Sequence, residues 1–217
     1  MAEIARIKVT LKGIRPPIWR RLEVPAAMSM ARLSDVVLAA FGWSNSHLHE
    51  FEIGKRSEAG CRRIGMPDLD ADDGLPPTTD AELAELFPWL AAEQARLLFP
   101  PPLEDEETVI LADLLTREKR FRYVYDFGDN WRHIVLTEAI VAADKETAYP
   151  RVTAGRRAAP PEDCGGTWGY EHLLEVLADP NHDEYAELRE QHPYLDAEEF
   201  DLAAADAAVR NPPEYWE

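Results

Sequence analysis

Apolar and polar residues alternate strictly at the start of the chain. Within residues 4–12, one side of the extended chain carries Ala5, Ile7, Val9 and Leu11, and the other carries Arg6, Lys8, Thr10 and Lys12. This period of two predicts a half-buried strand. Gly13 to Pro17 interrupt the pattern, and extended structure resumes from Ile18 to Val24. The two runs therefore predict an antiparallel hairpin.

A second alternating region surrounds a short break, Asp126-Phe-Gly-Asp-Asn130. The alternate positions are Phe121, Tyr123, Tyr125 and Phe127 before the break, and Trp131, His133, Val135 and Thr137 after it. Two such runs separated by Gly, Asp and Asn predict a β-hairpin with a short loop. A further alternation, His47 to Ile53, predicts another strand.

Helical periodicity appears between these strands and after them. Ser29 is the predicted N-cap of a helix that runs to Phe41 and stops at Gly42. Thr79 and Glu82 have the spacing of a capping box. A later helix, for which Thr167 is the predicted cap, has an apolar stripe made of Tyr170, Leu173, Leu174 and Leu177.

The length of 217 residues favours one domain, residues 1–217. Within it, residues 66–103 predict an acidic helical insertion or lid over the sheet, since so short a segment rarely folds alone. Residues 167–217 predict a set of C-terminal helices.

Charge is distributed unevenly along a chain whose net charge is −18. Residues 1–65 carry 11 Lys/Arg against 6 Asp/Glu, and residues 116–160 carry 9 against 6. By contrast, residues 66–115 carry 1 against 13, and residues 161–217 carry 2 against 16. The predicted strands are therefore basic and the predicted helices acidic. The acidic helices are either solvated faces that keep the protein soluble, or partners that neutralise a basic sheet.

Several classes of protein are excluded by composition. Cys61 and Cys164 are the two cysteines and form no paired motif, which excludes a disulfide framework and a zinc site made of cysteines alone. Charges at Glu3, Arg6 and Lys8 argue against a signal peptide, and no apolar run approaches a membrane span. We therefore expect a cytoplasmic protein that has no membrane partner.

The end of the predicted 121–137 hairpin concentrates polar chemistry. Asp126, Asp129 and His133 are candidate catalytic residues that would hold a divalent ion. His47 and His49, two residues apart on a strand, are further candidate metal ligands, together with Asp129 and His133. The alternative is structural, because Asp and Asn are ordinary turn formers and a histidine beside Phe and Ile is often a core residue.

Cys164-Gly165-Gly166 precedes the start of a predicted helix. A helix N-terminus lowers the pKa of a nearby thiol and presents backbone N–H groups to anions. Cys164 is therefore a candidate nucleophile, with His133 or His172 as its base. The alternative is a simple glycine turn.

A basic, aromatic surface is predicted on the first hairpin. Trp19, Arg20 and Arg21 would join Arg6 and Lys8 in stacking on bases and binding phosphates. Alternatively, Trp19 is a core residue and the arginines pair with the acidic segments. With the hairpin end and the glycine turn included, the candidate ligand-binding residues are Trp19, Arg20, Tyr125, Trp131, Gly165, Gly166 and Trp168.

Four stretches, in this order, resemble the plasmid pRiA4b ORF-3-like family, some of whose members are labelled transposon passengers of "TnpR" type. They are Arg15-Pro-Pro-Ile-Trp-Arg-Arg21, Leu48-His-Glu-Phe51, Tyr125-Asp-Phe-Gly-Asp-Asn-Trp-Arg-His133 and Cys164-Gly-Gly-Thr-Trp-Gly-Tyr170 followed by Leu-Ala-Asp-Pro. The resemblance spans nearly the whole chain. It implies an α+β fold with a mixed, mainly antiparallel sheet of β-hairpins packed with helices, and a mobile-element origin. It implies no particular activity.

Two functions remain as alternatives. The first is a non-catalytic binding or adaptor protein that holds a small ligand, a peptide or single-stranded nucleic acid near residues 126–133. The second is a metal-dependent, hydrolase-like enzyme that uses Asp126, Asp129 and His133 with a divalent metal as cofactor. Because the chain is acidic overall, duplex DNA is a poor partner. A serine recombinase, which the "TnpR" label suggests, needs an activated serine among arginines, and Ser29 and Ser34 lack that setting.

Overall fold

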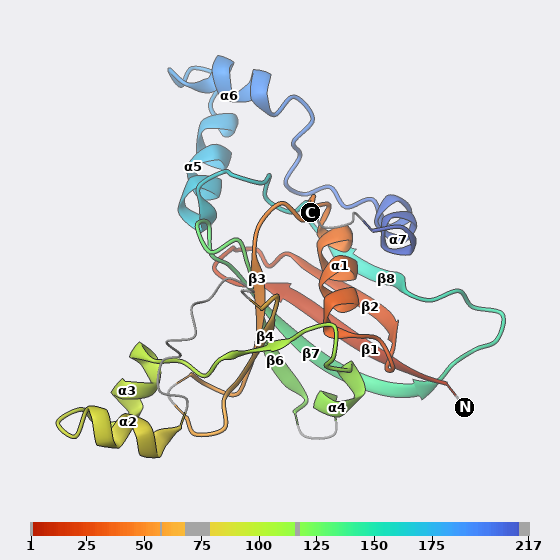
Figure 1. Ribbon diagram of the computed structural model, residues 1–217. Coiled ribbons are helices and arrows are strands. Elements are labelled where there is room, and N and C mark those ends of the chain that lie inside the picture. The colour runs from red at the N-terminus through yellow and green to blue at the C-terminus, as the bar shows by residue number, and fades with distance from the viewer. Residues whose placement is uncertain (1, 57, 68–78, 116–117, 213–217) are drawn as a thin grey trace.

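The computed structural model describes residues 2–56, 58–67, 79–115 and 118–212. Among them, eight strands form one sheet in the order β5-β4-β3-β6-β7-β1-β2-β8 (Figure 1). The strands are β1 Glu3–Leu11, β2 Trp19–Pro25, β3 His49–Ile53, β4 Arg62–Gly65, β5 Leu103–Asp105, β6 Arg120–Tyr125, β7 Trp131–Ala142 and β8 Arg151–Arg156. All neighbours are antiparallel except β4 and β5. The expected mixed, mainly antiparallel α+β fold is confirmed.

Seven helices complete the described part of the chain. They are α1 Met30–Phe41, α2 Asp80–Leu86, α3 Ala92–Leu98, α4 Leu111–Leu115, α5 Gly166–Ala178, α6 Tyr185–Gln191 and α7 Leu202–Arg210. No helix of the described residues is long and apolar enough to cross a bilayer. In Figure 1, α1 lies across the sheet with α7 beside it, whereas α2 and α3 project at the end of the molecule near β4. The predicted insertion, 66–103, includes residues 68–78, which lie outside the described residues.

Local capping explains where α1 and α2 begin. The Ser29 side chain accepts a hydrogen bond from the Arg32 N–H, and Gly42 ends α1 in the left-handed conformation. The capping box of Thr79 and Glu82 is present at the start of α2. Thr167 does not cap α5 as predicted. That helix begins at Gly166, and its N-cap is Gly165, whose left-handed φ of 87° suits glycine.

Alternate residues of the strands point to two faces of the sheet. The covered face packs against α1 and forms the core, to which the strands contribute Ala5, Ile7, Val9, Leu11, Leu22, Phe51, Phe121, Tyr123, Tyr125, Trp131 and Val135. The open face carries the intervening residues, of which Leu136 is 40% exposed. The predicted alternation in β1, β6 and β7 therefore matches the observed burial.

Candidate functional site

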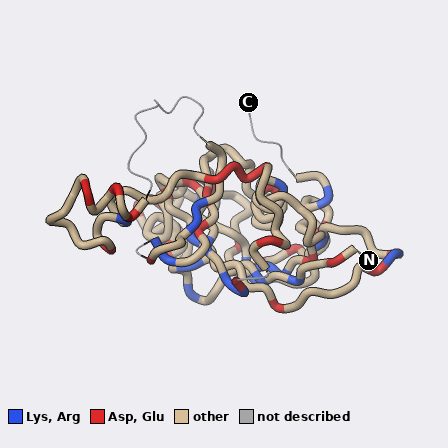
Figure 2. Tube along the Cα trace, turned by 60° about the horizontal axis from the view of Figure 1, so that its bottom comes forward, with Lys and Arg blue, Asp and Glu red and all other residues tan. Residues whose placement is uncertain are grey.

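The open face is rich in arginine. Strand register places nine basic side chains on it: Arg6, Lys8, Arg21, Arg63, Arg120, Arg122, Arg132, Arg151 and Arg156. The acidic residues at face positions are Glu23, Glu50, Glu52, Asp105 and Glu138. In Figure 2, the blue Lys and Arg segments gather along the lower side of the molecule. A chain that is strongly acidic overall thus keeps a positively charged sheet face.

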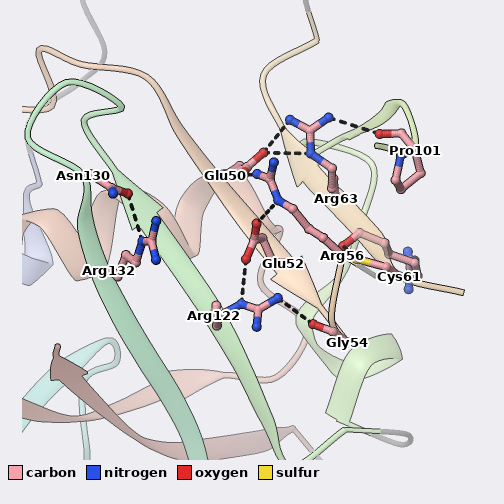
Figure 3. A network of polar contacts seen from close by, with 11 residues as sticks. Glu50, Glu52, Gly54, Arg56, Cys61, Arg63, Pro101, Arg122, Asn130 and Arg132 are labelled. Carbon is pink, nitrogen blue, oxygen red and sulfur yellow. Dashed lines mark hydrogen bonds and ion pairs between the residues drawn. The ribbon is translucent and has the colours of Figure 1, made fainter. Parts of the chain in front are cut away.

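A hollow of about 630 Å³, here called the arginine hollow, lies at one end of the open face. Its lining residues are Glu50, Glu52, Arg56, Arg63, Leu97, Arg122, Val124, Phe127, Asn130 and Arg132. Figure 3 shows the network that organises it. Arg63 binds Glu50 with N···O distances of 2.9 and 2.6 Å, and Arg122 binds Glu52 at 2.6 Å. Arg56 binds both glutamates.

The two glutamates of the arginine hollow act as anchors for the arginines. The Glu50 side chain is only 1% exposed and lies between Arg56 and Arg63. Burial by itself would raise the pKa of Glu52, but hydrogen bonds and charges from Arg56 and Arg122 outweigh it and hold the pKa below its ordinary value. The Glu52 carboxylate therefore stays ionised, and the ion pairs of both glutamates fix the guanidinium groups in place.

Other cations on the open face have no carboxylate partner. In the described parts of the chain, Lys8, Arg120, Arg132 and Arg156 form no ion pair, although Arg132 donates to the Asn130 side chain at 3.0 Å. Glu23, by contrast, already binds Arg6 and Arg151. The face therefore has surplus positive charge that is available to an anionic ligand.

The Trp19 surface forms only in part. Lys8 and Arg21 lie over the Trp19 ring, at 4.4 and 5.3 Å from its centroid. Arg20 lies on the covered face instead, because residues next to each other in a strand point to opposite sides. It is 2% exposed, and its guanidinium donates to the Ala40, Trp19 and Arg156 carbonyls. Arg20 therefore does not reach a ligand on the open face, contrary to the surface expected from the sequence.

The β6–β7 turn, residues 126–130, meets two other loops. His47, which precedes β3, has its Nε2 atom 3.8 Å from Asp126 Oδ2 and 3.0 Å from Asp163 Oδ1. Asp126 Oδ1 accepts from the backbone N–H groups of Gly128 and Asp129, which fixes the turn. One histidine and two carboxylates are thereby brought together from three separate segments.

Contacts between the turn and the 160–166 loop hold this arrangement. The Tyr125 hydroxyl donates to Glu162 at 2.6 Å, and the Gly165 N–H donates to Asp129 Oδ2 at 3.2 Å. A Cβ atom on Gly166 would lie 2.5 Å from the Asp129 carbonyl oxygen, so only glycine fits there. Burial, and then the hydrogen bond to Glu162, raises the pKa of Tyr125. The 126–130 turn and the Cys164-Gly165-Gly166 stretch thus pack directly against each other.

Cys164 lies in this loop but its thiol is not activated. Burial, followed by the negative charge of Asp129, raises the pKa of Cys164 to about 12. This direction is opposite to the one expected at a helix N-terminus, because burial of the thiol, and then the charge of Asp129, disfavour the thiolate. The thiolate needed for nucleophilic attack is scarce at neutral pH.

Of the other three metal candidates, Asp129 accepts the Gly165 N–H and is not part of this group, and the two histidines lie elsewhere. His49 Nε2 lies 2.7 Å from Glu106 within the core, so the two residues form a buried pair. His133 is fully buried on the covered face, where its ring contacts Phe41 and Trp43, and burial lowers its pKa to about 3. Neither belongs to the group that His47 forms with the two aspartates.

The two tryptophans proposed as ligand contacts differ in position. Trp131 is a core residue stacked on Trp43 at a centroid distance of 6.0 Å. Trp168 is 77% exposed on α5 and stacks on His172. A ligand at the surface could therefore touch Trp168 directly but not Trp131.

Sequence reasoning missed the residues that line the arginine hollow. The signal was present, since Glu50 and Glu52 alternate with buried His49 and Phe51, and the same period places Arg122 on the open face. It also missed Asp163, for which the sequence offers no signal, because its partners lie far away along the chain.

Comparisons with known proteins cover almost the full length. The chain matches the family described as plasmid pRiA4b ORF-3-like protein over residues 3–207. It is 35% identical over 211 residues to the uncharacterised protein y4hQ of Sinorhizobium fredii, an alignment that covers 97% of this chain and 90% of that protein. Its fold is similar to the crystal structure of MM3350, a protein of unknown function from Methanosarcina mazei Go1. That comparison gives a TM-score of 0.74 and 33% identity, and covers 94% of this chain and 97% of the other.

Proposed function

The chain belongs to the plasmid pRiA4b ORF-3-like family, and we propose that it is a non-catalytic binding protein for single-stranded nucleic acid. The observation that carries the proposal is the surplus of positive charge on the open face of a chain whose net charge is −18. Four glutamates share that face with nine basic side chains, and three of them bind two arginines each. The charge is therefore concentrated there despite the composition of the whole chain.

Aromatic side chains next to these cations favour nucleic acid over a simple anion. Phe127 is half exposed at the rim of the arginine hollow, beside Arg132 and Arg122. Bases stack on exposed aromatic rings while arginines neutralise the phosphates, which is how sequence-tolerant single-strand binders work. Trp19, with Lys8 and Arg21 over its ring, offers a second aromatic group further along the same face.

The acidic remainder of the molecule favours a flexible single strand over a duplex. Residues 66–115 and 161–217 contribute 29 Asp/Glu against 3 Lys/Arg. A rigid duplex would bring its second strand toward such charges, whereas a single strand can follow the open face alone.

Fluorescence anisotropy with a labelled oligothymidine tests the proposal. The triple variant Lys8→Ala, Arg120→Ala, Arg132→Ala removes three open-face cations that no ion pair requires, and we expect roughly tenfold or more weaker binding. The matched control is Arg32→Ala, Lys145→Ala, Arg210→Ala, which removes the same charge from α1, the β7–β8 connection and α7. The control should bind like the wild type.

Phe127→Ala separates nucleic acid from an acidic peptide. Loss of one stacked base weakens binding by about 1 kcal/mol or more, which is roughly fivefold. Polyglutamate of matched charge should compete poorly with the oligothymidine. Equal competition together with unchanged affinity of Phe127→Ala would refute the nucleic-acid proposal and point to an acidic peptide.

A further inference from the structure

His47, Asp126 and Asp163 form a compact group at the end of the sheet where the β6–β7 turn meets the 160–166 loop. Their candidate ligand atoms all lie within 4.8 Å of one another. The group offers one imidazole nitrogen and two carboxylates. It is separate from the cations of the open face and does not depend on what binds there.

One atom in this group, His47 Nε2, lacks the hydrogen-bond partner that buried polar atoms normally have. His47 Nε2 is buried and makes no hydrogen bond, because its 3.0 Å approach to Asp163 does not have hydrogen-bond geometry. The Asp126 side chain is only 10% exposed. Its Oδ1 atom accepts two backbone N–H groups, while Oδ2, which faces His47, accepts no hydrogen bond from the described residues.

We propose that these three residues bind a divalent metal ion. Two carboxylates balance the charge of the ion, and a neutral imidazole supplies its lone pair. A mixed set of one nitrogen and two oxygen ligands suits a first-row ion such as Zn²⁺. Asp163 is 73% exposed, so coordination positions on its side of the group face solvent.

The surrounding contacts prepare the group for binding. Glu162, bound by Tyr125, fixes the loop in which Asp163 lies. Asp126 and Asp163 both have a left-handed φ of 56°, which Asp and Asn tolerate better than other side chains. Asparagine at either position can therefore keep the backbone while the negative charge is lost.

Isothermal titration of the chelator-treated, full-length protein with Zn²⁺ at neutral pH tests the proposal. We expect one equivalent to bind the wild type. His47→Leu, Asp126→Asn and Asp163→Asn should each weaken binding by at least about tenfold, the loss that even an indirect change near a metal commonly causes. Affinity should also fall in acid, because protons compete for the imidazole.

A rival site supplies the control. His172, His182 and Glu184 lie together on the surface, with His172 Nε2 3.1 Å from Glu184. The double variant His172→Ala, His182→Ala should retain Zn²⁺ binding. The proposal is overturned if the wild type binds no Zn²⁺, if the double variant alone loses it, or if all three site variants bind like the wild type while melting as folded proteins.

Discussion

The covered and open faces use alternate residues of the same strands, yet they accommodate charge differently. On the open face, Glu50 and Glu52 each lie between two arginines and form ion pairs with both. On the covered face, Arg20 is bound to carbonyl groups and forms no ion pair within the described residues, and burial lowers its pKa to about 10. His133, deeper still, is held neutral. The comparison indicates that ion pairs stabilise the charged side chains of the open face, whereas burial away from water disfavours the charged forms of Arg20 and His133 on the covered face.

Truncating a large side chain should lower the free energy of unfolding far more on the covered face than on the open face. Phe51 is fully buried on β3 and contacts the rings of Tyr123 and Phe121. Phe51→Ala should lower the free energy of unfolding by about 3–5 kcal/mol, since it removes apolar contacts and leaves a cavity. Leu136→Ala, on the open face, should lower it by no more than about 1 kcal/mol. Urea denaturation measures both, and equal losses would contradict the assignment of the faces.

Acid should act on the covered face first, through His133. Its pKa in the fold is about 3, below the ordinary value of 6.5, so protonation favours the unfolded chain. The stability that depends on neutral His133 is complete above the ordinary pKa and is lost as pH falls from there toward 3. We expect a loss of about 2 kcal/mol between about pH 6.5 and pH 4.5.

The substitution His133→Asn should flatten this part of the stability profile, whatever its effect on absolute stability. His172→Asn, on the exposed surface of α5, is the control and should keep the wild-type slope. A wild-type slope in His133→Asn would show that another group titrates. The pKa of Glu52 is lowered, so its contribution is present above the ordinary glutamate pKa and is lost only below that value.

Neutralising a glutamate should distinguish buried from exposed ion pairs on the open face itself. Glu50→Gln keeps the side-chain shape but leaves Arg56 and Arg63 without their shared charge, and we expect a loss of about 1–3 kcal/mol. Glu138→Gln breaks the more exposed pair with Arg21 and should cost less than about 1 kcal/mol. Thermal unfolding of both variants tests this, and a larger loss for Glu138→Gln would reverse the ranking.

The smallest effect on stability should come from the unpaired cations. Arg120→Ala and Arg132→Ala remove exposed side chains, so the free energy of unfolding should change by less than about 0.5 kcal/mol. Urea denaturation with the wild type as reference measures this change. Marked destabilisation would mean that these arginines serve the fold rather than a ligand.

Much of the sheet was predictable from the sequence because period-two alternation is a local signal. It placed Trp131 and His133 on one side of a strand, and the structure shows that this side is the core. The same period-two alternation, applied to β2, assigns Arg20 to the covered face and Trp19 to the open face. Strands β4 and β5 have only 4 and 3 residues, too few to display a period.

The candidate sites were less predictable because they depend on contacts between distant segments. Asp163 lies beside His47 in a loop that Glu162 anchors to Tyr125, and the spacing of these residues in the sequence does not indicate that they are close. The pKa of Cys164 likewise depends on Asp129 from another loop. A local motif indicated an activated thiol, whereas burial and then the Asp129 carboxylate raise its pKa.

The salt dependence of oligothymidine binding tests the central claim most directly. The logarithm of the association constant falls with the logarithm of salt concentration, with a slope of about 0.7 per neutralised phosphate on a single strand. Loss of Lys8, Arg120 and Arg132 together should reduce that slope by roughly 2, while Arg32→Ala, Lys145→Ala, Arg210→Ala should leave it unchanged. Equal slopes for the two triple variants would contradict the assignment of the open face as the nucleic-acid surface.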